Sequence, residues 1–198
     1  MPQDLQTLKT QMLACSICEG LELGPRPIFQ LDENVRILIV GQAPGRLTHA
    51  KNRPFDDPSG ERLRSWLGVD LSTFYEDNRI GMFPMGLCFP GSGSGGDKPP
   101  RDECAKTWRT SVMATLQNVE LTLVLGRYAI AWHVPDLKNL SVTEAVKRSA
   151  SGQNGIFVLP HPSPRNNRWL KRNEWFEAQV IPRIQREVAR LLARTVSS

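Results

Sequence analysis

The sequence predicts an α/β protein, a three-layer α/β/α sandwich around a central, mainly parallel sheet of four strands. Short apolar runs alternate with segments of helical periodicity, and each run ends at a glycine or proline. This alternation is typical of a parallel sheet with helices on both faces. The chain has 198 residues and no internal repeat or linker, so we expect a single domain over residues 1–198.

The first half of the chain opens with a predicted helix over residues 4–17, whose apolar residues share one face. Residues 35–40 form a nearly continuous β-branched run, which indicates a buried parallel strand. Residues 41–45 then turn sharply out of that strand. The next helix is expected to begin at Ser59 as its N-cap and to stop near Gly68.

Residues 82–89 predict a second strand, interrupted by Pro84. Residues 91–100 are rich in glycine, serine and proline and predict a surface loop. Asp102 is the expected N-cap of a helix through residue 116.

The last third of the chain predicts two further strands, over residues 121–125 and 156–159, with a helix after Gly126. A long amphipathic helix closes the chain and is expected to kink at Pro182.

The net charge is +5 and the sequence pI about 9.3. A basic balance favours a polyanionic partner, although solubility alone explains it equally well. The N-terminus shows no apolar signal region and no stretch has the length of a membrane span, so we expect an intracellular monomer that binds no membrane. Four cysteines in a reducing compartment are not expected to form disulfides.

Three motifs occur in order: Gly-Gln-Ala-Pro-Gly at residues 41–45, Pro54-Phe55 followed by Ser59-Gly60, and His161-Pro162-Ser163. Together they resemble the uracil-DNA glycosylase superfamily, closest to family 4, its iron–sulfur type. The resemblance spans residues 15–165. It implies DNA as the partner and excision of a flipped-out uracil or related deaminated base.

The cysteines extend the resemblance, because family 4 places four cluster-ligating cysteines at corresponding places. The four are Cys15, Cys18, Cys88 and Cys104. A quartet of thiolates holds either a [4Fe–4S] cluster or zinc, and spacing alone also allows unliganded cysteines. The resemblance favours [4Fe–4S], with a structural role.

The resemblance also implies roles for the motif residues. His161 matches the histidine that donates a hydrogen bond to the leaving base. Stabilising the negative charge that develops on that base is the main contribution to catalysis. Phe55 matches the aromatic wall on which the flipped base stacks. Gly41, Ala43 and Pro84 complete the expected base pocket, and His49 and His133 are assigned no chemistry.

Two positions depart from the family. Family 4 has glutamate at the position of Gln42, and the best-known family has aspartate at that of Ala43; Gln42 can orient a water molecule but cannot accept its proton. Asp56 and Asp57 are possible substitutes.

Family 4 also has a base-reading asparagine where this chain has Pro84, which offers neither an amide side chain nor an N–H. Main-chain groups of residues 82–86, or Asn52, would then read the base, unless the specificity has shifted to another base.

Ser163 matches a phosphate contact, and Arg165 and Asn166 continue the last motif in a way that resembles the single-strand-selective monofunctional branch, in which this loop enters the duplex. Two basic groups flank the motifs. One comprises Arg165, Arg168, Lys171 and Arg172, and the other Arg46, Lys51 and Arg53.

The sequence therefore favours an active monofunctional DNA glycosylase. It leaves open a catalytically silent reader of damaged bases, and an unrelated activity on the same fold such as a nucleoside hydrolase.

Overall fold

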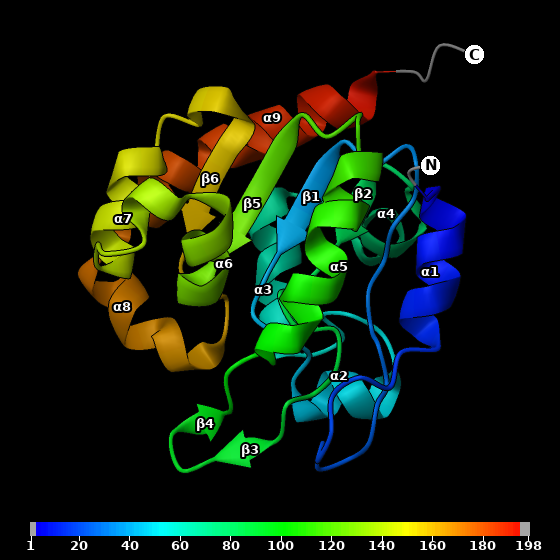
Figure 1. Cartoon of the computed structure of the whole chain (residues 1–198). Helices are drawn as coiled ribbons and strands as arrows, with labels where there is room; N and C mark the ends of the chain where they lie inside the picture. The colour runs from blue at the N-terminus through cyan, green and yellow to red at the C-terminus, as the bar shows by residue number, and fades with distance from the viewer. Residues whose placement is uncertain (1–2, 195–198) are drawn as a thin grey trace.

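The computed structural model describes residues 3–194 and contains a four-stranded sheet in the order β2-β1-β5-β6, with every neighbouring pair parallel. The strands are β1 (Ile37–Val40), β2 (Ile80–Met82), β5 (Leu121–Leu125) and β6 (Ile156–Leu159). Helices cover both faces of the sheet (Figure 1). The predicted α/β class and its parallel four-stranded sheet are therefore confirmed.

The central strand β1 is buried along its whole length, which its apolar sequence explains. Its residue Ile37 pairs with Ile80 of β2 on one side and with Leu121 of β5 on the other. β5 and β6 have the bounds that the sequence predicted, since both are short apolar runs closed by a glycine or proline.

The helices form the two outer layers. α3 and α9 pack together on one face of the sheet, while α5 and α6 lie on the other, and α1 packs beside α5 (Figure 1). The α-helices are α1 (Leu5–Leu13), α2 (Arg46–Lys51), α3 (Pro58–Leu67), α4 (Leu71–Glu76), α5 (Asp102–Thr115), α6 (Gly126–His133), α7 (Val142–Ser149), α8 (Asn167–Arg172) and α9 (Ile181–Ala193).

Three predicted helix termini are wrong. α1 ends at Leu13 rather than residue 17. Asp57, not Ser59, is the N-cap of α3 and accepts the N–H of Gly60 at 2.9 Å. The N-cap of α5 is Arg101, so Asp102 lies in the first turn, where its negative charge is favourable next to the helix dipole.

The predicted strand over residues 82–89 is also wrong. β2 ends at Met82, and residues 83–89 form a buried loop in which Phe83, Leu87 and Phe89 are each 2% exposed or less. Pro84 lacks the N–H that a strand at this position would need. The apolar character of the segment therefore reflects the burial of an irregular loop rather than a strand.

Two other expectations need correction. The predicted loop at residues 91–100 contains a two-stranded hairpin of β3 (Ser92–Gly93) and β4 (Gly96–Asp97). The final helical segment consists of a π-helical turn, Phe176–Val180, followed by α9. Pro182 lies in the first turn of α9, directly after the π-helical turn, so the helical segment is irregular at the predicted place.

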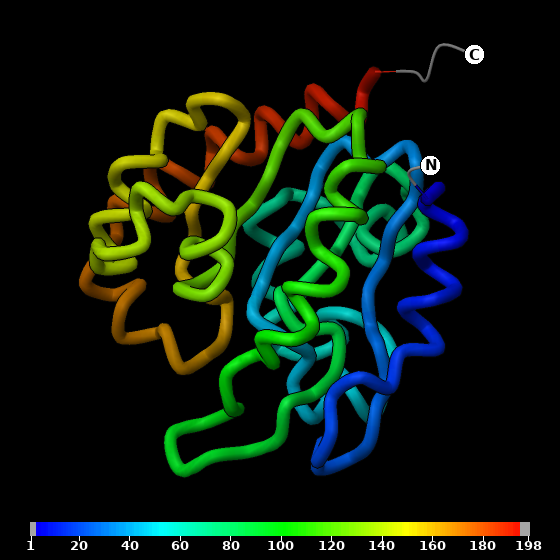
Figure 2. Tube along the Cα trace, in the orientation of Figure 1, coloured from blue at the N-terminus to red at the C-terminus, as the bar shows by residue number. Residues whose placement is uncertain are grey.

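The carboxyl ends of the strands point to one edge of the domain. The hairpin β3–β4, α2 and the segment after α1 gather at this edge (Figures 1 and 2). In parallel sheets this edge is where ligands bind. Among the helices of residues 3–194, none has the length and apolar character required to cross a membrane.

Candidate active site

A cleft of about 580 Å³ opens at the carboxyl ends of the strands, a volume within the roughly 300–1,000 Å³ of small-molecule sites. All predicted catalytic, pocket and DNA-binding residues except Arg53 line it. They are Gly41, Gln42, Ala43, Arg46, Phe55, Pro84, His161, Ser163, Arg165 and Asn166. The fold thus brings together the three motifs that are far apart in the sequence.

Phe55 forms one wall of the cleft in a backbone conformation that is rare for a bulky residue, with φ at +53°. The hydroxyl of Tyr75 donates to the carbonyl oxygen of the preceding Pro54 at 2.8 Å. A Cβ atom on Gly41 would lie 3.7 Å from the Cζ atom of the Phe55 ring. The ring of Phe55 therefore lies within van der Waals reach of the first motif.

His161 follows β6 and is half-buried in the cleft. The backbone N–H of Ser163 donates to its Nδ1 atom at 3.2 Å, and the side chain of Asn166 donates to its carbonyl oxygen at 2.7 Å. Burial lowers the pKa of His161, although the carboxylates of Asp57 and Asp97 oppose the shift. A neutral ring whose Nδ1 accepts carries its proton on Nε2, so His161 can act as a hydrogen-bond donor.

Arg62 of α3 fastens the loop that carries His161. Its guanidinium donates to the carbonyl oxygens of Pro162 and Ser163, each at 3.1 Å, and to the side chain of Asn167 at 2.7 Å. This role of Arg62 was not evident from the sequence, because an arginine in an amphipathic helix is usually exposed to solvent.

The backbone N–H groups of residues 82–86, which were expected to contribute to base reading together with the other main-chain groups there, are engaged within the protein. Met82, Phe83, Met85 and Gly86 each donate their N–H to a backbone carbonyl at 2.7 to 2.9 Å, and Pro84 has no N–H. The alternative reader, Asn52, is exposed and does not line the cleft. Base reading by this segment would therefore fall to its carbonyl oxygens, and Asn52 is not placed in the cleft to contribute.

Behind this segment lies Arg109, which is only 1% exposed. It donates to the carbonyl oxygens of Phe83 and Pro84 at 2.8 and 2.6 Å, and its second nitrogen lies 2.7 Å from Nε2 of His133. Burial lowers the pKa of Arg109 to about 10, and burial together with this arginine lowers the pKa of His133 to about 3. A neutral His133 can therefore accept from Arg109, which anchors the floor of the cleft. The only sequence signal was that Arg109 precedes the core residue Val112 by three positions, on the same helix face.

The carboxylates near Phe55 have different roles. Asp56 pairs with Lys51 at 3.1 Å and with Arg53 at 3.0 Å, and it does not line the cleft. Asp57 lines the cleft but caps α3. A further carboxylate in the cleft, Asp97 of β4, was missed because it lies in the segment predicted as a loop.

The two predicted basic groups are placed differently. Arg46 and Arg165 line the cleft, and Arg46 also pairs with Glu22. Arg53 is held elsewhere, over the ring of Tyr75 at 4.2 Å and against Asp56. The remaining members, Lys51, Arg168, Lys171 and Arg172, are exposed.

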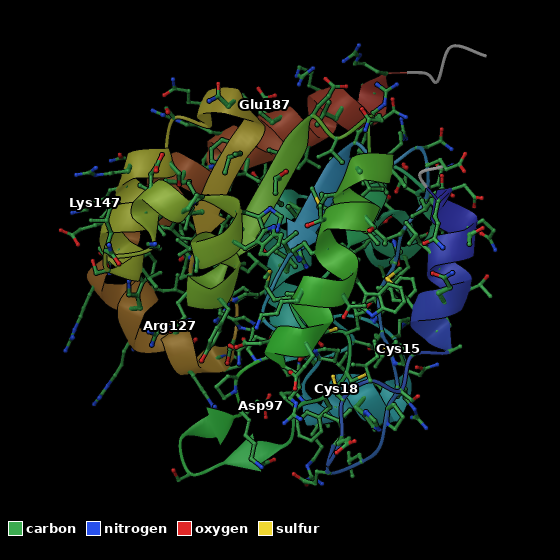
Figure 3. All side chains as sticks on the ribbon, in the orientation of Figure 1. Cys15, Cys18, Asp97, Arg127, Lys147 and Glu187 are labelled. Atoms are coloured by element: carbon green, nitrogen blue, oxygen red, sulfur yellow. The ribbon has the colours of Figure 1, made fainter. Side chains whose placement is uncertain are left out.

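The four cysteines line a second pocket, together with apolar residues and Arg101. The backbone N–H of Leu87 donates to the sulfur of Cys104 at 3.2 Å. Burial raises the pKa of Cys88 to about 11 and that of Cys104 to about 12, so a nearby cation would be needed to keep these groups as thiolates. Cys15 and Cys18 reach the pocket from the segment after α1 (Figure 3). Within residues 3–194, no three His, Cys, Asp or Glu side chains are arranged to hold a single metal ion.

Two comparisons relate the chain to known proteins, and the second of them, a family model, agrees with the motifs. A solution NMR structure of a proposed uracil DNA glycosylase from Methanosarcina acetivorans is similar to this chain, with a TM-score of 0.49 and 20% identity, over 81% of this chain and 97% of that one. The family model of the uracil DNA glycosylase superfamily matches residues 28–185. The chain belongs to the uracil DNA glycosylase superfamily.

Proposed function

We propose that the protein is a monofunctional DNA N-glycosylase that removes uracil or a related deaminated base and leaves an abasic site. The observation that carries the proposal is that His161 and Phe55 line the same cleft, with the Nδ1 atom of His161 occupied by the N–H of Ser163. His161 offers a hydrogen-bond donor to a leaving base, and Phe55 offers a surface on which that base can stack.

The chemistry follows from these two groups. A base within a duplex is out of reach, so it is flipped into the cleft, where the ring of Phe55 would stack on it. Cleavage of the N-glycosidic bond places negative charge on the base and positive charge on the sugar. The Nε2–H of His161 would stabilise the charge on the base, which is the kind of contribution that fixed donors make in a partly dry site.

The DNA strand would lie along the mouth of the cleft. Arg46, Ser163 and Arg165 line that mouth, and positive side chains bind phosphates by releasing counterions. Asn166 donates its amide to the carbonyl of His161, so we assign it to support of the loop rather than to direct readout of DNA.

We further propose that the protein is of the family 4 type, with a [4Fe–4S] cluster. The proposal is supported by the chemistry of the donors, because the four cysteines line one largely apolar pocket and a backbone N–H donates to Cys104. Within residues 3–194 the thiols are not already gathered around a single ion, so binding would have to draw them together. Cys15, Cys18, Cys88 and Cys104 would hold the cluster. When bound it would supply a structural crosslink between the segment after α1, the loop beneath the cleft and α5. Zinc is the alternative occupant of a four-thiolate site.

A second function is favoured by one specific observation. Gln42 donates its amide to the carbonyl oxygen of Lys98 at 3.2 Å, and neither Gln42 nor Ala43 carries a carboxylate. The same cleft could therefore serve a protein that binds damaged bases without hydrolysing the bond.

An excision assay separates the two functions. Labelled oligonucleotides with uracil, hypoxanthine, xanthine or 5-hydroxymethyluracil, single-stranded and paired, are incubated with the protein and treated with alkali to cleave abasic sites. We expect cleavage at one of these bases, reduced roughly 100- to 1,000-fold in His161→Ala, the loss typical of removing one such donor. Phe55→Ala is also expected to lose activity, while Trp132→Ala, an exposed aromatic residue on α6, is the matched control.

Binding without cleavage at every base would favour the silent reader. Cleavage of free nucleosides in preference to DNA would contradict both.

A further inference from the structure

The hairpin β3–β4 is fastened to both sides of the cleft. The amide of Gln42 in the first motif donates to the carbonyl oxygen of Lys98, and Arg165 in the last motif donates to that of Gly95 at 3.4 Å. The backbone N–H of Ser92 also donates to Glu22 at 3.0 Å. These contacts place a segment of low sequence complexity across the mouth of the proposed catalytic site.

Asp97 is the carboxylate that this hairpin contributes. It lines the cleft together with His161, and its Oδ2 atom lies 3.3 Å from the position that a Cβ atom on Gly45 would take. Figure 3 shows it between the hairpin and the rest of the domain. Its negative charge, together with that of Asp57, opposes the effect of burial on the pKa of His161. The exposed side chain of Asp97 therefore lines the same cleft as the proposed reacting groups.

The carboxylate of Asp97 is not engaged elsewhere in the described part of the chain. The hairpin is bonded to the cleft through the carbonyl oxygens of Gly95 and Lys98, and within residues 3–194 the Asp97 carboxylate makes no hydrogen bond or ion pair. Asp57, the other aspartate in the cleft, is occupied in capping α3. Asp57 thus has one carboxylate oxygen engaged, whereas within residues 3–194 both carboxylate oxygens of Asp97 are without a hydrogen bond and available to a substrate.

We propose that Asp97 of the hairpin is the catalytic carboxylate of this protein. It would have the role that an acidic residue of the first motif would otherwise have. The proposal rests on the glycosylase function proposed above. It also accounts for a first motif whose side chains, Gln42 and Ala43, are uncharged: the negative charge reaches the cleft from a different segment of the chain.

The bond between C1′ and the base nitrogen breaks, its electron pair leaves with the base, and His161 donates a hydrogen bond to the base anion. Asp97 stabilises the positively charged sugar and accepts a proton from a water molecule as the oxygen of that water bonds to C1′. The proton then passes to solvent, and the base anion takes up another from solvent.

The test compares Asp97→Asn with Asp136→Asn, which removes an exposed carboxylate of the 3₁₀ segment Pro135–Leu137 outside the cleft. Single-turnover excision is measured on the oligonucleotide that the wild-type protein cleaves, and affinity is measured on the same strand with an abasic site. We expect Asp97→Asn to lose roughly 100-fold or more in rate, as removal of a general base does. Its affinity for DNA should be unchanged or higher, because a negative charge near phosphates has been removed.

Asp97→Glu should recover part of the rate, and Asp136→Asn should match the wild-type protein. An active wild-type protein with a fully active Asp97→Asn variant overturns this proposal and leaves the proposed function standing. Equal losses of rate and DNA affinity in Asp97→Asn also overturn it, because they indicate a role in binding only. A wild-type protein that cleaves none of the substrates overturns the proposed function, and this proposal with it.

Discussion

Gly60, in the first turn of α3, lies so close to the carbonyl group of Phe55 that no side chain fits between them. The same turn holds Phe55 in its left-handed backbone conformation, and Asp57 secures it by accepting the N–H of Gly60. Backbone strain of this kind persists only where the surrounding structure enforces it. The position of the aromatic wall therefore depends on the absence of a side chain at residue 60.

We predict that Gly60→Ala displaces Phe55 and lowers both stability and excision. A methyl group at this site meets backbone rather than a flexible side chain, and overpacking of this kind costs about 1–3 kcal/mol. Urea denaturation gives the free energy of unfolding, and the excision assay gives the rate. Gly93→Ala is the control, because a Cβ atom there meets only ordinary contacts. Equal stability of the two variants would contradict the packing argument.

A second prediction concerns the pH dependence of excision. The pKa of His161 is lowered by burial from its ordinary value of 6.5, so the ring stays neutral at a pH where an exposed histidine becomes charged. We expect the single-turnover rate to persist as the pH falls through 6.5 and to decline only below it. A pH profile measured in the wild-type protein tests this. A rate that instead rises as the pH falls through 6.5 would indicate that the charged ring is the active form.

The sequence predicted the sheet well, because β5 and β6 are short apolar runs with clear ends and β1 is buried on both faces. It failed for β2, because the residues after Met82 are apolar for a different reason: they are buried as an irregular loop beneath the cleft. It also missed the short helices α2 and α4, each of which is less than two turns long and too short for periodicity to identify.

The site was predictable where topology alone places residues. Gly41 directly follows β1, and His161 is the second residue after β6. Such positions converge at one edge of a parallel sheet. Asp97 and Arg109 were not predictable in this way. The place of Asp97 depends on long-range contacts of the hairpin, and that of Arg109 on carbonyl groups that face inward because Pro84 interrupts the strand.

A third prediction follows from the burial of Arg109. Arg109→Met removes both donors to the carbonyl oxygens of Phe83 and Pro84, and each buried polar group without a partner costs about 1–3 kcal/mol. We expect a loss of stability of that order and a lower excision rate, measured by urea denaturation and by single-turnover assay. Arg127→Met, at an exposed position of α6, should change neither. If Arg109→Met is as stable as the wild-type protein, these hydrogen bonds make no net contribution to the free energy of unfolding.

His133 gives a fourth prediction, on stability rather than activity. Its pKa is lowered from 6.5 to about 3 in the folded protein, so below pH 6.5 the unfolded chain binds a proton that the folded protein does not. Stability is therefore full above pH 6.5 and falls as the pH decreases towards 3. His133→Gln keeps an acceptor for Arg109 but does not titrate, so its urea midpoint should fall less on acidification. Equal losses of stability on acidification in the wild-type protein and in His133→Gln would contradict the assignment of this pH dependence to His133.

The last prediction concerns the four cysteines. The thiol of Cys104 is buried and that of Cys88 partly buried, and their raised pKa values oppose ionisation. Metal binding requires thiolates and couples the free energy of binding to folding. We expect anaerobically purified protein to contain iron and sulfide and to absorb visible light. Cys104→Ser should lose the iron, the absorbance and part of the thermal stability, while Ser111→Ala, at an exposed position of the same helix, should keep all three. Zinc in place of iron would identify the alternative four-thiolate site. Metal-free protein whose melting temperature is unaffected by Cys104→Ser would contradict a structural metal of either kind, because the cysteines would then contribute to the pocket only as small apolar side chains.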